Sequence, residues 1–306
     1  MIKKILYFGN PARLSLRLGQ LVIKRKSPDG GEQEDTRPVE DLGAVIIDNP
    51  QVTFTSGIID ALLANNCAVV TCDSRHMPSG LFLPLDGHTT QSERFREQIS
   101  ASVPLLKQLW QQTVKCKIKN QACILEKCIG EKHPCMHRWS DDVKSGDAGN
   151  MEARAAAYYW KCMYSAIDGF VRGRDGIPPN NLLNYGYAVL RAIVARALVG
   201  SGLLPTLGIH HHNRYNAFCL ADDIMEPYRP YVDELVFNMF HKYASQGEME
   251  DITREMKAEL LSVATVDVNI GGKTHPLMVA ADITASSLRK CFSGELRRIA
   301  YPLLNG

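Results

Sequence analysis

A run of three histidines is followed closely by a stretch that carries three carboxylates. The set comprises His210, His211, His212, Asp222, Asp223 and Glu226. Imidazole nitrogens suit transition metals, whereas carboxylate oxygens suit Mg²⁺ or Mn²⁺. A mixed set of both kinds of ligand fits Mn²⁺ best, with Mg²⁺ as the ion expected in the cell. A divalent cation at such a site can polarise a phosphate ester and activate a bound hydroxyl group.

Helical stepping of about 100° per residue separates this stretch into two faces. The carboxylates fall on one side, and the apolar side chains on the other are Phe218, Leu220, Ala221, Ile224, Met225 and Tyr228. An acidic face of this kind is usually just solvated, and the histidines would then form an exposed loop. Acids on one face repel one another, however, unless a cation relieves them. Arg229 can offset part of that repulsion, and both interpretations stay open on this segment alone.

Glu152 is a second candidate ligand. The same stepping puts it on one face with Ala156, Tyr159 and Met163, and a carboxylate on an apolar face is costly to bury unless it is paired or binds a metal. The alternative is an acid in the first helical turn, favoured by the helix dipole, with Asn150 as the cap. The residue types do not decide between the two.

Two further patterns are weaker. Gly271–Thr274 reads GGKT, but a phosphate-binding loop needs a glycine where Asp267 stands, so we expect a hairpin. A zinc site is disfavoured because no two cysteines have the close spacing of a zinc knuckle. The residues concerned are Cys116, Cys123, Cys128, Cys135, His133 and His137. The nine cysteines are expected to be reduced thiols.

The elements that position these side chains change in character near residue 90. Before it, strands are expected at 5–9, 14–25, 42–48 and 67–73, with a polar hairpin loop at 24–35 and a Thr/Ser-capped helix at 55–66. After it, the apolar period becomes helical. The fold class is α+β: a small N-terminal β-rich domain, 1–90, is followed by a larger, mainly α-helical C-terminal domain, 91–306.

Within the helical part we expect a long helix or helix pair at 92–125 and a polar linker at 137–150. Further helices are expected at 150–167 and 180–203, then the helix with the carboxylates. The remaining expected elements are helices at 232–245 and 248–264, a hairpin at 266–280 that turns at Gly271-Gly272, and a closing helix at 286–304.

The composition sets limits on partners and location. The formal net charge of +2 over 306 residues does not mark a general nucleic-acid binder, so DNA binding would rest on local basic patches. The N-terminus lacks the apolar core of a signal peptide, and no apolar run looks long enough to cross a bilayer. We therefore expect a cytoplasmic protein without membrane contact.

Several segments together resemble one known family, the CRISPR adaptation integrases, which are the universal first CRISPR-associated protein. The resemblance spans essentially the whole chain. Within the family, the chain is similar to the branch that accompanies a single large RNA-guided effector nuclease. The matching segments are GIHHHNRYNAFCLADDIMEPYRP at 208–230, MEARAAAYYW at 151–160, KIKNQACIL at 117–125, PPNNLLNYGYAVLRA at 178–192 and SSLRKCF at 286–292.

This resemblance implies a metal site in the helical domain, with Glu152, His211 and Glu226 as the metal-binding and catalytic residues. His211 is preferred among the three histidines because of its spacing to the last acid, and Asp223 is a secondary candidate. Mg²⁺ or Mn²⁺ is the implied cofactor. The N-terminal domain would serve in dimerisation and partner contact. The implied partners are a second copy of the chain, the small second CRISPR-associated protein, and double-stranded DNA as protospacer fragment and CRISPR repeat; the effector nuclease is a further candidate.

The implied function is insertion of short foreign DNA fragments as new spacers, by metal-dependent transesterification from a 3′-hydroxyl. With water as the nucleophile, the same site would act as an endonuclease. A non-catalytic DNA-binding scaffold and a general nuclease are the alternatives. DNA would be held mainly through its phosphates. Candidate basic clusters are Lys115, Lys117 and Lys119, Arg172 and Arg174, Arg289 and Lys290, and Arg297 and Arg298.

Overall fold

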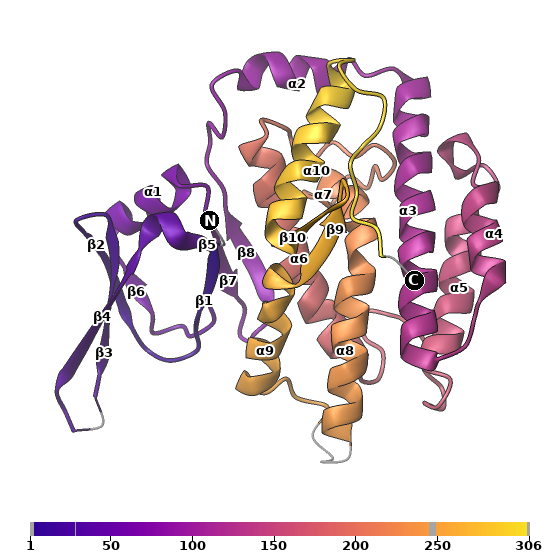
Figure 1. Cartoon of the computed structure of the whole chain (residues 1–306). Coiled ribbons are helices and arrows are strands. Elements are labelled where there is room, and N and C mark those ends of the chain that lie inside the picture. The colour runs from indigo at the N-terminus through magenta and orange to yellow at the C-terminus, as the bar shows by residue number, and fades with distance from the viewer. Residues whose placement is uncertain (1–2, 28, 245–248, 305–306) are drawn as a thin grey trace. The chain divides into compact units, whose positions relative to one another are not determined.

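The structure, a computed structural model, describes residues 3–27, 29–244 and 249–304 (Figure 1). The chain divides into two compact units, Met1–Thr89 and Thr90–Gly306. The first unit is rich in β-strands and the second is mainly helical, which confirms the predicted fold class.

The N-terminal unit contains two four-stranded sheets. Its elements are β1 (Lys4–Phe8), β2 (Arg13–Arg17), β3 (Gln20–Lys26), β4 (Glu32–Pro38), β5 (Leu42–Ile47), β6 (Thr53–Phe54), α1 (Ser56–Ala64), β7 (Ala68–Cys72) and β8 (Pro78–Phe82). One sheet has the order β1-β5-β7-β8, with β1, β5 and β7 parallel, and the other has the order β4-β3-β2-β6. Every residue of β5 is buried, as expected for a central parallel strand.

Two local predictions for this unit were incomplete. The single strand expected at 14–25 is a hairpin, because Leu18 and Gly19 both take positive φ angles and turn the chain between β2 and β3. Most of the loop expected at 24–35 belongs to β3 and β4, which pair from Lys26 with Glu32; residue 28 of that loop lies outside the described residues. β8 had no distinct signal in the sequence.

The second unit is built around two long helices, α3 and α6. Its helices are α2 (Gln91–Ile99), α3 (Val103–Ile129), α4 (Pro134–Asp142), α5 (Met151–Met163), α6 (Asn180–Gly200), α7 (Cys219–Met225), α8 (Arg229–Tyr243), α9 (Arg254–Leu261) and α10 (Leu277–Phe292). Of the two alternatives expected at 92–125, a long helix or a helix pair, the structure has the pair, α2 and α3. The predicted hairpin is confirmed as β9 (Asp267–Ile270) and β10 (Lys273–Pro276).

α3 packs against α4, α5 and α8, whereas α6 packs against α7, α8 and α10 (Figure 1). The two central helices therefore hold the elements that carry the candidate site: α5 packs on α3, α7 packs on α6, and α8 packs on both. α6 is the one helix, within the described part of the chain, whose length and composition would allow it to cross a membrane, contrary to the sequence-based expectation. Because 83% of its apolar window is buried inside the protein, α6 has the environment of a core helix.

Three expectations for the helical unit need correction. The polar linker expected at 137–150 is partly α4, whose Met136 and Ser140 are buried. The closing helix expected at 286–304 begins earlier, at Leu277, and ends at Phe292, and the residues that follow up to Leu304 form turns, bends and irregular chain. The helix expected at 248–264 begins at Arg254; residues 245 and 248, which were also assigned to helices, lie outside the described residues.

Candidate metal centre

Glu152 stands in the first turn of α5, and Asp147 fixes the start of that helix. The carboxylate of Asp147 accepts the backbone N–H of Met151 at 2.9 Å and that of Glu152 at 3.0 Å. Asn150, the cap of the alternative interpretation, does occupy the N-cap position, but its backbone is left-handed, with φ of 51°, and its side chain makes no capping bond. The Glu152 side chain is largely buried and reaches α3, where Lys117 Nζ donates to its Oε1 at 2.7 Å.

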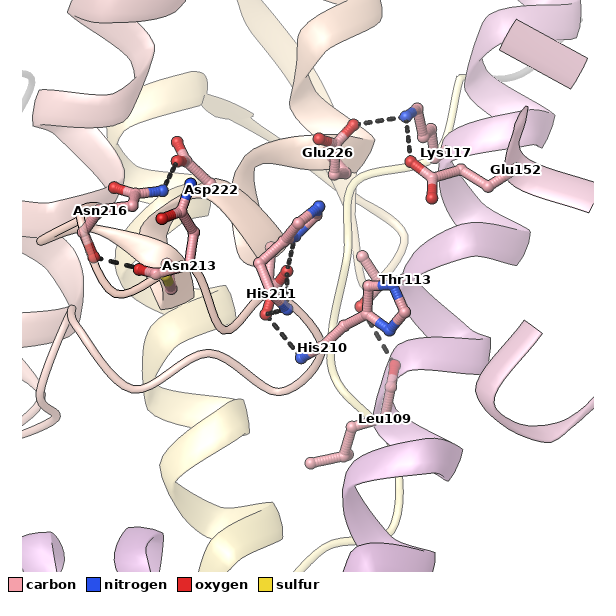
Figure 2. A network of polar contacts seen from close by, with 12 residues as sticks. Leu109, Thr113, Lys117, Glu152, His210, His211, Asn213, Asn216, Asp222 and Glu226 are labelled. Atoms are coloured by element: carbon pink, nitrogen blue, oxygen red, sulfur yellow. Dashed lines mark hydrogen bonds and ion pairs between the residues drawn. The ribbon is translucent and has the colours of Figure 1, made fainter. Parts of the chain in front are cut away.

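Glu226 begins the short 3-10 turn Glu226–Tyr228 that joins α7 to α8. Its Oε1 lies 3.0 Å from Arg229 Nη2, so the expected pairing with Arg229 is confirmed. Its Oε2 lies 2.6 Å from Lys117 Nζ. One ammonium group thus contacts both Glu152 and Glu226, which come from different helices (Figure 2). The structure therefore brings the two predicted acids together.

His211 lies on the loop before α7, and the fully buried Asp223 holds it in place. The Asp223 carboxylate accepts the backbone N–H of His210 at 2.8 Å and of His211 at 3.3 Å, and it also contacts His211 Nδ1. A carboxylate can only accept, so Nδ1 carries the proton and a neutral His211 presents Nε2 as its lone-pair nitrogen. Asp223 therefore has the position of an orienting residue for this imidazole.

The charge of His211 is coupled to both acids. The hydrogen bond to Asp223 raises the pKa of His211, against the effect of burial, and Glu226 and Glu152 add smaller contributions in the same direction. Conversely, His211 helps to lower the pKa of Glu226. The imidazole and the two carboxylates thus belong to one electrostatic group, although their elements are separate in the sequence.

The other two histidines are placed differently. The His210 ring stacks flat on Trp110 of α3, with centroids 4.2 Å apart and planes within 1° of parallel. His212 is exposed and, like His211, lines a cavity. The stacking of His210 and the buried anchor of His211 together favour His211 as the ligand. Trp110 had no signal in the sequence that pointed to this site.

Gly208 permits the close approach of this loop to α7. A Cβ atom at this position would lie 2.3 Å from the carbonyl oxygen of His211, 2.8 Å from Asp223 Oδ2 and 3.1 Å from Cys219 Cβ. The first two distances are shorter than real Cβ contacts, and the first of them involves rigid backbone. A side chain at Gly208 would therefore push the histidine loop away from Asp223.

The acidic face read from the helical pattern is not solvated, because all three of its carboxylates are buried. Asp222 accepts from Arg191 Nε at 2.6 Å and from Asn216 Nδ2 at 2.7 Å, and Figure 2 shows the contact with Asn216. Asp223 pairs with His211, and Glu226 with Arg229 and Lys117. Each acid has its own basic partner, which explains how the face tolerates burial.

At the Glu152–Glu226 pair, neighbouring charges of opposite sign offset the effect of burial on the pKa values. Burial alone would raise the pKa of Glu226, but Arg229 and Lys117 outweigh it and lower that pKa. Burial alone would lower the pKa of Lys117, but Glu226 and Glu152 outweigh it and raise that pKa. Glu226 and Lys117 are therefore both charged in the folded protein.

The donor atoms fit a hard divalent cation, although Lys117 lies between the acids. In the described part of the chain, no group of three or more His, Cys, Asp or Glu side chains is arranged as it stands to hold a metal ion. Glu226 Oε2 is buried at ion-pair distance from Lys117, yet it receives no bond of hydrogen-bond geometry from any described residue. A buried carboxylate oxygen in this state, beside a second carboxylate and an oriented imidazole, is the donor set that Mn²⁺ or Mg²⁺ would take.

Asn120 on α3 supports the turn that carries Glu226. Its Nδ2 donates to the carbonyl oxygen of Pro227 at 2.8 Å and to that of Pro302 at 3.0 Å. Its Oδ1 accepts the backbone N–H of Leu304 at 3.0 Å. One side chain thus joins the Glu226 turn to the irregular segment that follows α10.

A basic cavity of about 330 Å³ adjoins the acid pair. Its cationic lining comprises Lys117, Arg172, Arg174 and Arg229, and Trp160 and Tyr187 add aromatic walls. Among the other predicted basic residues, Lys119 is exposed and lies 3.7 Å from Asp141, Arg289 pairs with Glu295, and Arg297 and Arg298 are exposed. Lys117 itself points inward, so the expected cluster of Lys115, Lys117 and Lys119 does not form one surface.

The disfavoured zinc set is dispersed among structural contacts. Cys116 Sγ lies 3.3 Å from the carbonyl oxygen of Pro302, and Cys123 Sγ lies 3.4 Å from that of Leu304. His133 donates its backbone N–H to Glu126, and the ring of His137 contacts the same carboxylate at 3.0 Å.

Comparison with solved structures shows which class of protein has this fold. A casposase bound to an integration product superposes with a TM-score of 0.76, at 21% identity, covering 98% of this chain and 92% of the casposase. A Cas6-RT-Cas1–Cas2 complex gives a TM-score of 0.71, at 18% identity, covering 96% of this chain and 35% of the other. The fold is that of the Cas1-like proteins.

The sequence comparisons identify the family. The profile described as CRISPR associated protein Cas1 matches residues 5–266. The CRISPR-associated endonuclease Cas1 of Neisseria meningitidis serogroup C (strain 8013) is 34% identical over 293 residues, covering 94% of this chain and 92% of that protein. The chain belongs to the Cas1 family of CRISPR-associated endonucleases, and the family predicted from the sequence is confirmed.

Proposed function

We propose that this Cas1 protein carries out CRISPR adaptation by inserting short DNA fragments into the repeat array, and that Glu152, His211 and Glu226 form its active site. The observation that carries the proposal is the shared contact of Lys117 Nζ with both acids, at 2.7 and 2.6 Å. His211 completes the group through its coupling to the same acids.

Glu152, His211 Nε2 and Glu226 would hold the cation, for which Mn²⁺ and Mg²⁺ are our candidates. When bound, such an ion supplies Lewis-acid polarisation of a phosphate ester and lowers the pKa of a coordinated hydroxyl. The chain's own contribution is to orient and to balance charge. Asp223 fixes the imidazole, Asp147 fixes the first turn of α5, and Arg229 holds Glu226 beside the basic cavity.

The incoming nucleophile would be the 3′-hydroxyl of a captured duplex, and the bond broken would be a phosphodiester of the repeat. Charge that develops on the attacked phosphate would be met by Arg229 and by the arginines of the cavity. Water in place of the 3′-hydroxyl would give hydrolysis, so integration and endonuclease activity would share one site.

We also propose the assembly and the location. The casposase structure contains an integration product and the Cas6-RT-Cas1–Cas2 structure contains Cas2, which supports DNA and Cas2 as partners of this chain. We propose further that the chain acts as a homodimer in the cytoplasm, with residues 1–90 in dimerisation and partner contact. The branch with a single large effector nuclease, and that nuclease as a partner, are proposals from sequence resemblance.

The decisive experiment joins a duplex with free 3′-hydroxyls to a plasmid that carries the repeat array, in the presence of Mn²⁺ and Cas2. Glu152→Gln, His211→Ala and Glu226→Gln should each reduce joining by at least about 100-fold, since each removes a ligand of the cation. Glu131→Gln, an exposed acid in the same unit, is the matched control and should join normally. Normal joining by all three site variants would refute the assignment.

A second assay separates the alternatives. A non-catalytic scaffold would bind duplex DNA in a salt-dependent manner yet neither join nor cut it. A general nuclease would release cleaved products without joined ones. We expect joined products, and Arg174→Ala should weaken DNA binding and lower the slope of log affinity against log salt by about 1.

A further inference from the structure

Lys117 has an unusual environment for a lysine. Its side chain is only 9% exposed, and its ammonium group lies between the oxygens of two buried or half-buried carboxylates. On an α-helix, Lys117 points about 200° away from Lys115 and from Lys119, so it faces the interior while its neighbours face outward. The lysine thus occupies the point on which the two acids converge (Figure 2).

The charges around this point are balanced as they stand. Glu152 and Glu226 are the two negative groups, and Lys117 and Arg229 are the two positive groups in contact with them. A divalent cation added to this arrangement would leave a partly buried cluster with excess positive charge, which is unfavourable at low dielectric. Cation binding is therefore favoured if one of the two basic groups moves away.

Lys117 is the group that can move. Arg229 also packs over Tyr187, with its guanidinium carbon 4.7 Å from the ring centroid, and it is fixed by the turn it follows. The lysine ammonium sits on a flexible stem and contacts Glu226 without hydrogen-bond geometry. Lys117 also lines the cavity of about 330 Å³ that holds Arg172 and Arg174, so a place for the released ammonium lies next to the acids.

We propose that Lys117 is an internal counter-cation of the Glu152–Glu226 pair: it neutralises the pair in the metal-free protein, and an entering divalent cation displaces its ammonium toward the arginine-lined cavity. This inference rests on the proposed metal site. It assigns Lys117 a positioning role, in which the residue competes with the cation for the carboxylates. A DNA phosphate in the cavity would then gain one more cationic partner.

The test measures Mn²⁺ binding by calorimetry and thermal shift on the full chain. Lys117→Met should lower the Tm of the metal-free protein, because two acids lose a partner, and should tighten Mn²⁺ binding by about tenfold. Lys117→Arg keeps the charge but can hold both carboxylates through a bidentate fork, so it should weaken Mn²⁺ binding relative to wild type. Lys119→Met is the matched control on the same helix and should leave Mn²⁺ affinity unchanged.

A chemical readout follows the ammonium directly. Reductive methylation with mass spectrometry should leave Lys117 protected in the metal-free wild type and should modify it once Mn²⁺ is added, whereas Lys119 should be modified equally in both. Continued protection of Lys117 at saturating Mn²⁺, or a Lys117→Arg affinity equal to wild type, overturns the inference while the metal site stands. Failure of wild type to bind Mn²⁺, or unchanged binding in Glu152→Gln and Glu226→Gln, overturns the metal site itself.

Discussion

The carboxylate of Asp223 accepts both the backbone N–H and the ring Nδ1–H of His211. Asp223 is fully buried, and the His211 side chain is almost half exposed. The acid therefore holds one edge of the imidazole from the protein interior, while the rest of the ring faces solvent. Groups that hold a metal-binding imidazole in this way fix its tautomer and increase its basicity. Asp223 therefore matters for Mn²⁺ affinity without contacting the cation.

Asp223→Asn should weaken Mn²⁺ binding by about 10- to 100-fold, because the amide turns a donor toward N–H groups that need an acceptor. Calorimetric titration with Mn²⁺ measures the effect. Asp222→Asn is the matched control, since Asp222 is a neighbouring buried acid that pairs with Arg191 instead. The control should lose stability but keep its Mn²⁺ affinity, and equal losses in both variants would contradict an orienting role for Asp223.

Single alanine substitutions in the histidine run should separate its three members. His211→Ala should abolish strand transfer, whereas His212→Ala should retain it, because His211 is the ring that the buried Asp223 carboxylate holds in place. His210→Ala should give an intermediate rate, since its stacking on Trp110 positions the loop but supplies no ligand. Rates of joining under saturating Mn²⁺ check this order. A His210→Ala defect as deep as that of His211→Ala would mean that the ligand has been misassigned.

Gly208→Ala should destabilise the protein by about 1–3 kcal/mol and should also weaken Mn²⁺ binding, since the added methyl collides with the backbone of His211. Denaturant unfolding and Mn²⁺ titration measure the two effects. Gly57→Ala is the control, because a Cβ at Gly57 meets no atom within 4 Å and the residue lies in α1. Its stability should be unchanged or slightly higher. A Gly208→Ala protein with wild-type affinity would show that the loop can adjust.

Asp233 on α8 gives a prediction for pH. Burial raises the pKa of Asp233 to about 7, although hydrogen bonds from Tyr187 and Tyr159 act in the opposite direction. In the unfolded chain the pKa is about 3.9. Between these values the folded protein keeps a proton that the unfolded chain releases, so the stability from this group falls as pH rises from about 4 to about 7. The other ionisable groups that face Asp233 are Arg172, Arg229, Tyr164 and Cys128.

Asp233→Asn removes this titration. Its free energy of unfolding, relative to wild type, should therefore increase with pH across that window, by about 1.4 kcal/mol for each unit by which the two pKa values differ. Urea unfolding at pH 5, 6, 7 and 8 gives the comparison. Asp251→Asn, an exposed acid in the same unit, should run parallel to wild type. Parallel curves for Asp233→Asn would show that Asp233 is ionised throughout.

The predictability of the site from sequence differs among its residues. The helical period identified Glu152 as a carboxylate on an apolar face, and the resemblance to the CRISPR adaptation integrases identified His211 and Glu226. Lys117 was read as part of a basic cluster, because alternating lysines look alike until the helix pitch turns one of them inward. Trp110 acts through a contact with His210, which is distant in sequence, and no local pattern reports such a contact. Asp147 lies only five residues before Glu152, and its role depends on a left-handed turn that the residue types did not indicate.

The fold shows the same division. Long periodic segments such as α3 and α6 were predicted because their apolar faces repeat over many turns. α4 was missed because polar residues dominate it, and only Met136 and Ser140 are buried within it. The three acids on α7 and its following turn were weighed as a solvated face because the sequence does not show the basic partners, Arg191 and Lys117, that arrive from other helices.

Asn120 couples Pro302 and Leu304 to the turn that carries Glu226. Because the Asn120 amide bonds both to the Pro227 carbonyl and to the backbone of Pro302 and Leu304, substitutions in Tyr301–Leu304 should disturb the position of Glu226. A genetic screen for loss of spacer acquisition should therefore recover substitutions at Tyr301–Leu304 as well as substitutions of Glu152, Glu226 and His211.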